Sequence, residues 1–139
     1  MNTRVDEATN RQMQGYNCSQ AVACTYSDLF NLDEQIVKNI TQGFGMGLGG
    51  SLEGNCGAIS GGTVILGLYY AQREQDALVA KKKTMLATKM LVEKFQTRNQ
   101  EITCKKLKGI DTGKMLRSCK DCVRDVAEFV EDILGEEAK

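Results

Sequence analysis

The stretch of chain that decides the fold is GFGMGLGGSLEGNCGAISGG, residues 43–62. Its first part, residues 43–54, holds too many glycines for a regular helix or strand, so it must turn tightly or approach another segment closely. A GxGxxG pattern lies within it, but that pattern binds nucleotides after a β-strand, and a predicted helix precedes it here. From Cys56 to about Ala71 the chain is apolar on all sides, which predicts a helix at the centre of a bundle.

The uncharged run 54–72 also has the length of a membrane span. It contains five glycines and four polar side chains, those of Asn55, Ser60, Thr63 and Gln72. Because such residues are costly to transfer into lipid, we expect a buried helix and no membrane association.

The rest of the chain favours helices throughout. Proline is absent and β-branched alternation is scarce, whereas apolar residues recur with the helical period. We therefore expect an all-α fold, a compact bundle of about six to seven helices with a Gly-rich loop before the buried central helix, in one domain spanning residues 1–139. The helices are expected at about residues 5–14, 18–30, 34–42, 56–71, 74–98, 104–108 and 119–134. The side chains expected to face inward include Ile36, Val37 and Ile40 on the third helix and Leu78, Leu86, Met90, Leu91 and Phe95 on the long fifth helix.

Composition excludes several classes of function. The 18 basic and 18 acidic side chains cancel, which disfavours a dedicated nucleic-acid or anionic-membrane binder. The chain has no histidine, so Cys-His and Ser-His nucleophile pairs and histidine metal ligands are excluded. Six cysteines are too few for a disulfide-stapled secreted scaffold, and the first residues contain no apolar signal segment. We expect a cytoplasmic protein whose reduced thiols serve a site.

The position of the cysteines is informative, because four of them directly follow a residue that commonly caps a helix. The four pairs are Asn17-Cys18, Asn55-Cys56, Thr103-Cys104 and Ser118-Cys119. At a helix N-terminus the unpaired N–H groups and the macrodipole favour an anion, so these thiols are expected to ionise readily. We predict that the helix starts converge in one pocket where several thiolates coexist without a compensating lysine or arginine.

The remaining cysteines and two glycines carry further predictions. Cys119 and Cys122 form a CxxC pair, which is typical of a redox dithiol or of half a four-thiolate metal site. Cys24 lies on another helical face and is expected to pack in the core. Gly57 and Gly61 leave a flat, side-chain-free face beside Cys56, which predicts close approach by a helix or a bound group.

The spacing of Cys18, Cys56-Gly57-Ala58-Ile59-Ser60-Gly61, Cys104 and Cys122 resembles a family of redox-active proteins labelled by the pattern C_GCAxxG_C_C, over nearly the whole chain. The Ala58-x-x-Gly61 spacing is kept, whereas Asn55 stands where the label has glycine. The chain is also similar to the non-haem part of split-Soret cytochromes, where an iron–sulfur centre accompanies haems. Val123 stands where haem attachment would need histidine. The resemblance implies an all-helical redox domain with four cysteines in one site, as a homodimer, and gives no role to Cys24 or Cys119.

Three functions remain open at this point. In the first, Cys18, Cys56, Cys104 and Cys122 bind an iron–sulfur cluster for electron transfer, with Cys119 as an alternate ligand. In the second, a cofactor-free thiol-disulfide oxidoreductase uses Cys119 to attack and Cys122 to resolve, which would make the protein an enzyme. The third is a structural zinc site. The apolar surface of the central and long helices also predicts a homodimer, and the sequence does not identify the redox partner protein.

Overall fold

The computed structural model describes residues 3–135, and within that range the chain forms seven α-helices and no β-strand. The all-α prediction is therefore confirmed. None of the helices in this range is both long and apolar enough to cross a membrane. The α-helices are α1 (Val5–Met13), α2 (Cys18–Thr25), α3 (Glu34–Thr41), α4 (Gly57–Arg73), α5 (Ala77–Asn99), α6 (Cys104–Lys108) and α7 (Cys119–Leu134), with short 3-10 helices η1 (Ser27–Phe30) and η2 (Gln42–Phe44).

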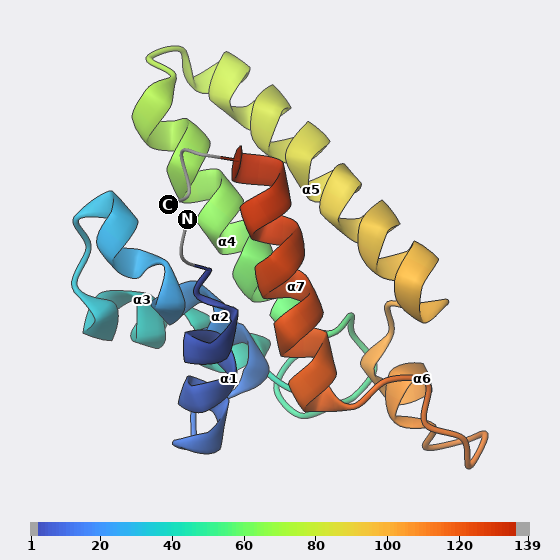
Figure 1. Cartoon of the computed structure of the whole chain (residues 1–139). Helices are drawn as coiled ribbons and strands as arrows, with labels where there is room; N and C mark the ends of the chain where they lie inside the picture. The colour runs from blue at the N-terminus through green and yellow to red at the C-terminus, as the bar shows by residue number, and fades with distance from the viewer. Residues whose placement is uncertain (1–2, 136–139) are drawn as a thin grey trace.

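Helix α4 lies at the centre of the bundle, as its apolar sequence predicts. It packs against α2, α5 and α7, and Figure 1 shows it between the long α5 and the smaller N-terminal helices. Its Ile65 and Leu66 are fully buried. A Cβ atom at Gly62 would lie 2.8 Å from Cγ1 of Val126, so this glycine lets α7 pack directly on α4.

Most of the expected helix starts are confirmed, with one shift that matters for the site. Asn17 caps α2 in a reciprocal capping box with Gln20, and the Ser118 hydroxyl accepts a hydrogen bond from an amide of α7. Asn55 does not cap α4, because the cap position is held by Cys56 itself. The Asn55 side chain instead donates to the Cys56 carbonyl at 2.9 Å and to the Ser60 hydroxyl at 3.1 Å, and Cys56 is the last residue before the helix.

Two expectations about the helices are wrong. The second helix ends at Thr25, where the Thr25 hydroxyl bonds the Ala21 carbonyl and the Ser27 hydroxyl bonds the Cys24 carbonyl, and a 3-10 turn follows. Such side-chain bonds to the backbone compete with regular helix.

The inward faces of α3 and α5 are also narrower than expected. Ile36 and Ile40 are exposed, and only Val37 of that group is buried. On α5 the buried apolar side chains are Ala87, Leu91 and Phe95, whereas Leu78, Val79, Leu86 and Met90 are exposed. The reason is that α5 packs on α4 and α7 along a single face, at the edge of the bundle.

Candidate functional site

Five of the six cysteine side chains line one cavity at the end of the bundle where α2, α4, α6 and α7 begin. They are Cys18, Cys56, Cys104, Cys119 and Cys122. Figure 1 shows α6 and the start of α7 at this end, beside the loop that precedes α4. The predicted convergence of the capped cysteines is therefore confirmed, although Cys18 and Cys119 lie about a hundred residues apart.

Backbone hydrogen bonds hold the Gly-rich loop against the segment before α6. The amide of Cys56 donates to the Ile102 carbonyl at 2.7 Å, and the amide of Cys104 donates to the Gly54 carbonyl at 2.9 Å. A Cβ atom at Gly47 would lie only 2.8 Å from Cβ of Cys104. The glycines of this loop thus allow the close approach that places Cys104 beside Cys56.

Gly57 and Gly61 perform the close approach predicted for them, and their partner is α2. A Cβ atom at Gly57 would collide with the sulfur of Cys18, and one at Gly61 would collide with the carbonyl of Ser19. The side-chain-free start of α4 therefore brings Cys18 next to Cys56. Contact of these glycines with a bound group remains a prediction.

The cavity is small. It offers about 20 Å³ to the centre of a water molecule, which is room for roughly one water. Met46 and Leu107 supply apolar walls. Cys18, Cys56, Cys104 and Cys122 are buried, and Cys119 alone of the five is partly exposed. A group larger than one water would need the lining side chains to move outward.

Burial contributes to raising the pKa of three cavity thiols, those of Cys18, Cys56 and Cys104. It raises the pKa of Cys18, although the amide of Met46 acts to lower it, and it raises the pKa of Cys104 to about 11. A hydrogen bond with the Cys122 thiol, together with burial, raises the pKa of Cys56 well above its ordinary value. The expectation that helix N-termini lower the thiol pKa values is wrong for Cys18, Cys56 and Cys104, because the pKa of each of these three is raised.

Two cations line the cavity, contrary to the expectation that none is needed. Lys108 shares a hydrogen bond with Cys119, which raises the pKa of the lysine. Arg117 is held in place by Asp125, to which its Nε and Nη2 atoms donate at 3.0 and 2.9 Å. Burial by itself raises the pKa of Asp125, but the hydrogen bonds from Arg117, Asn99 and Arg98 together lower it below its usual value. The sequence did carry one signal of this arrangement, since Asp125 interrupts the apolar stripe of α7.

The lining of the cavity is rich in sulfur, which is the donor that iron–sulfur clusters require. In residues 3–135, no three Cys, Asp or Glu side chains are arranged so that they could hold one ion. Thiolates are nevertheless the ligands that such clusters use, and the cavity offers five sulfurs. The side-chain-free surfaces at Gly47 and Gly57 lie directly against two of them, Cys104 and Cys18.

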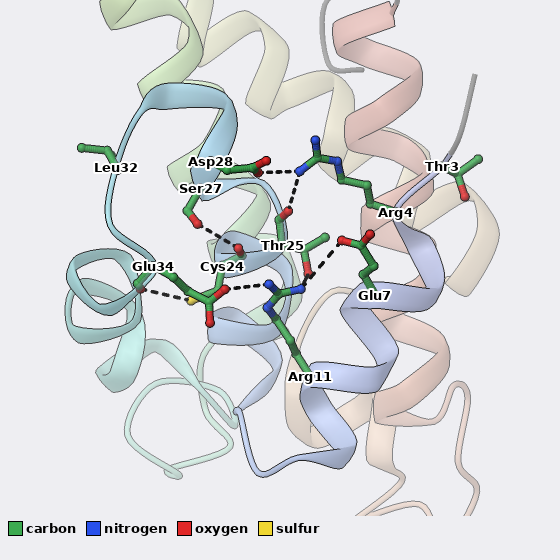
Figure 2. Close-up of a pocket in the computed structure, with 10 residues that line it drawn as sticks. All are labelled: Thr3, Arg4, Glu7, Arg11, Cys24, Thr25, Ser27, Asp28, Leu32 and Glu34. Atoms are coloured by element: carbon green, nitrogen blue, oxygen red, sulfur yellow. Dashed lines mark hydrogen bonds and ion pairs between the residues drawn. The ribbon is translucent and has the colours of Figure 1, made fainter.

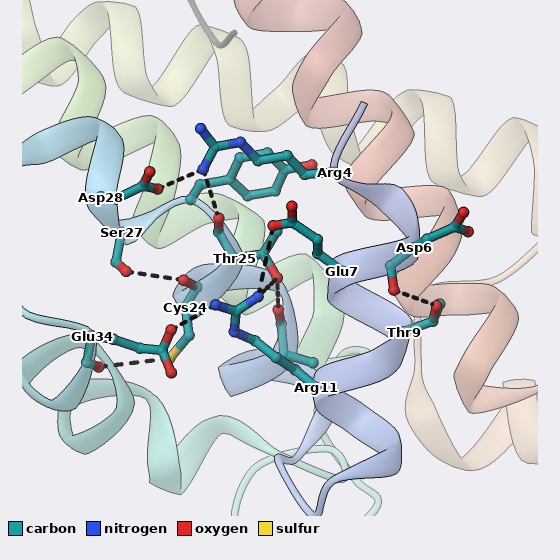
Figure 3. Close-up of polar contacts among 12 residues, drawn as sticks. Arg4, Asp6, Glu7, Thr9, Arg11, Cys24, Thr25, Ser27, Asp28 and Glu34 are labelled. Carbon is teal, nitrogen blue, oxygen red and sulfur yellow. Dashed lines mark hydrogen bonds and ion pairs between the residues drawn. The ribbon is translucent and has the colours of Figure 1, made fainter. Parts of the chain in front are cut away.

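Cys24 lies outside this site, as predicted. It borders a separate surface pocket of about 660 Å³ between α1, η1 and α3, which Figure 2 shows. The arginines of that pocket are neutralised there, because Arg4 pairs with Asp28 and Arg11 pairs with Glu34, as Figure 3 shows. The Cys24 thiol donates to the Glu34 carbonyl at 3.8 Å and is buried, which agrees with the packing role expected for it.

Comparison with known proteins adds one finding. The family model described as "Putative redox-active protein (C_GCAxxG_C_C)" matches residues 16–133. The chain belongs to this family. No curated protein and no solved structure matches the sequence. The matched range includes all five cysteines of the cavity, so the cavity is the candidate redox centre of this C_GCAxxG_C_C protein.

Proposed function

We propose that this C_GCAxxG_C_C protein transfers electrons through an iron–sulfur cluster bound by the thiolates of Cys18, Cys56, Cys104 and Cys122. The observation that supports this is the meeting of sulfurs from four separate helix starts in one cavity. Four thiolates are the usual requirement of such a cluster. When bound, the cluster supplies reversible one-electron transfer. Cys119 would be the alternate ligand.

The protein's own residues would stabilise such a centre in three ways. Lys108 and Arg117 place positive charge beside the thiolates, which offsets the cost of deprotonating buried sulfurs. The amide of Met46 acts on Cys18, and the amides of Ala58 and Ile59 act on Cys56, each favouring the ionised sulfur. Hydrogen bonds to ligand sulfurs and exclusion of water are the means by which proteins set the potential of a cluster.

Cysteine variants test this proposal. Protein purified without oxygen is assayed for iron and acid-labile sulfide as wild type, as Cys56→Ser and as Cys24→Ser. Cys56→Ser should lose most of the iron and sulfide, whereas Cys24→Ser, a buried cysteine outside the cavity, should keep the wild-type content. Equal content in all three proteins, or loss only in Cys24→Ser, would contradict the proposal.

A second candidate function is favoured by the contact between Lys108 and Cys119. Cys119 is partly exposed at the start of α7, and Cys122 is buried one turn further along. As a cofactor-free oxidoreductase, the Cys119 thiolate would attack a substrate disulfide and release one substrate thiol. The Cys122 thiolate would then attack the mixed disulfide, releasing the second substrate thiol and leaving a Cys119–Cys122 disulfide. Cys119→Ser distinguishes the two functions. If the protein binds a cluster for electron transfer, the variant should keep the cluster; if the protein is a thiol-disulfide oxidoreductase, the variant should lose disulfide reduction.

A structural zinc site has less support, because the described residues contain no group arranged for one ion. We further propose a homodimer that buries the exposed apolar side chains of α5, among them Leu78, Met85 and Leu86. Light scattering at micromolar concentration tests this, and a monomeric mass with the centre intact would refute it. The six unpaired cysteines suit a reducing compartment such as the cytoplasm.

A further inference from the structure

Basic side chains are concentrated around the only partly exposed sulfur of the cavity. Residues 104–120 carry six lysine and arginine side chains and one acidic one, Asp111, in a chain of zero net charge. The six are Lys105, Lys106, Lys108, Lys114, Arg117 and Lys120. We propose that this segment, here called the basic rim, together with the tip of the Gly-rich loop, is the docking surface for an acidic redox partner protein. This inference rests on the proposed function in that the partner exchanges electrons with the five-cysteine cavity.

Some basic side chains of the rim form ion pairs within the protein, and others are free to bind a partner. Lys105 pairs with Glu53 and Asp111, Lys106 pairs with Glu101, and Arg117 pairs with Asp125. Lys114 and Lys120 are exposed, and neither has an ion-pair partner within residues 3–135. Lys108 faces the sulfur of Cys119. The rim therefore presents the positive charges of Lys114 and Lys120 to solvent, and Lys120 directly follows Cys119 in the chain.

The same surface exposes large apolar side chains. Met46 and Leu48 of the loop are each 47% exposed, and Met115 of the rim is 59% exposed. The loop and the rim are joined, because the Lys105 amide donates to the Leu52 carbonyl at 3.0 Å and Gly47 packs on Cys104. Met46 also lines the cavity, so apolar surface in water extends to the site.

This combination identifies the class of partner. Protein interfaces have an apolar centre and a polar rim, whereas nucleic acid is bound mainly through charge contacts to phosphate. A partner with acidic side chains around its own redox group would match the lysines and cover Met46 and Met115. Opposite charge also accelerates association, and this acceleration falls with salt. The redox group would then face Cys119, the most accessible sulfur of the cavity.

A binding experiment tests the docking surface independently of the cofactor. The probe is an acidic plant-type ferredoxin, whose dissociation constant is measured at low and at physiological ionic strength. The double variant Lys114→Glu/Lys120→Glu should weaken binding at low salt by about tenfold or more. The matched control, Lys81→Glu/Lys82→Glu, changes net charge equally on the α5 face proposed above for the homodimer. Its mass is checked by light scattering, and it should bind the ferredoxin as wild type does. Met115→Ser should weaken binding of the ferredoxin. It should leave unchanged the rate at which ferricyanide oxidises the reduced protein, because this small anion does not need the apolar contact.

Equal effects of the rim and α5 charge reversals, or no binding by the wild type at low salt, would overturn the docking proposal. Iron and sulfide content is measured on the same samples. If the protein contains no iron but only the rim variant loses ferredoxin binding, the docking surface is supported and the cluster is refuted. Failure of the docking proposal can therefore be distinguished from failure of the cluster proposal.

Discussion

Replacement of Gly57 by alanine would perturb the contact on which the cavity depends. The added methyl group would collide with the sulfur of Cys18, and it would lie 2.8 Å from the Phe44 carbonyl oxygen and 3.2 Å from Cα of Gly45. Two of these three neighbours are backbone atoms, which cannot rotate away. Either α2 or the Gly-rich loop must therefore move, and the sulfur of Cys18 moves with it.

The size of the effect follows from two opposing contributions. Overpacking of a tight contact costs about 1–3 kcal/mol. Alanine gains up to about 0.5–1 kcal/mol over glycine in a helix, and less at the first position of α4. The free energy of unfolding should therefore fall by about 0.5–2 kcal/mol. On the same helix Gly67 provides a matched control, because its added Cβ would meet only Cγ2 of Thr84, at 3.8 Å. Gly67→Ala should leave stability unchanged or raise it by up to about 1 kcal/mol.

Urea unfolding followed by circular dichroism measures both stability changes, and iron content measures the state of the site. Gly57→Ala should lower the urea midpoint and reduce bound iron, whereas Gly67→Ala should keep the wild-type iron. If Gly57→Ala unfolded at the same urea concentration as Gly67→Ala and bound full iron, the inferred packing of α4 on Cys18 would be wrong.

Three further outcomes are expected. Asp125→Asn should lower the free energy of unfolding in urea by about 1–3 kcal/mol, because Arg117 loses its ion-pair partner while remaining partly in water. Since folding lowers the pKa of Asp125, the wild type should lose the stability that this carboxylate contributes as the pH falls through and below the ordinary aspartate range. The variant should not show this loss. The metal-free protein should lose stability between about pH 9 and 11, by up to about 1.4 kcal/mol per pH unit for the Cys104 thiol, because this thiol ionises in the unfolded chain and keeps its proton in the folded protein. A flat profile from thermal unfolding would contradict this. Tyr26→Phe should cost about 1–3 kcal/mol in urea unfolding, because the Tyr26 hydroxyl donates to the buried Glu131 carboxylate at 2.5 Å. An unchanged urea midpoint would contradict this.

The all-α class and the positions of several helix ends could be predicted from the sequence, because they depend on local chemistry. Gly109 ends α6 and Ser118 caps α7, as expected for residue types that favour helix ends. The inward faces of α3 and α5 were not predictable in the same way. Ile36 and Leu78 fit an apolar stripe, yet burial depends on which neighbours the bundle supplies, and that is set by tertiary packing.

The convergence of the cysteines could be predicted from the caps, but their ionisation could not. The helix dipole is a local quantity that the sequence displays, whereas desolvation depends on the final depth of each sulfur. Lys108 and Arg117 were missed for a related reason. From the sequence, a lysine on a short helix such as Lys108 is expected to face solvent. Only the fold shows that its side chain lies beside Cys119.

The visible absorption spectrum of protein purified without oxygen, recorded with its iron and sulfide content, tests the central claim most directly. A protein that binds the proposed cluster should show a charge-transfer absorption that bleaches on reduction. Iron and acid-labile sulfide should be present together at more than one atom of each per chain, as a cluster with two irons and two sulfides requires. A colourless protein that contains neither iron nor sulfide, and whose cavity thiols all react with a thiol reagent after unfolding, would contradict it.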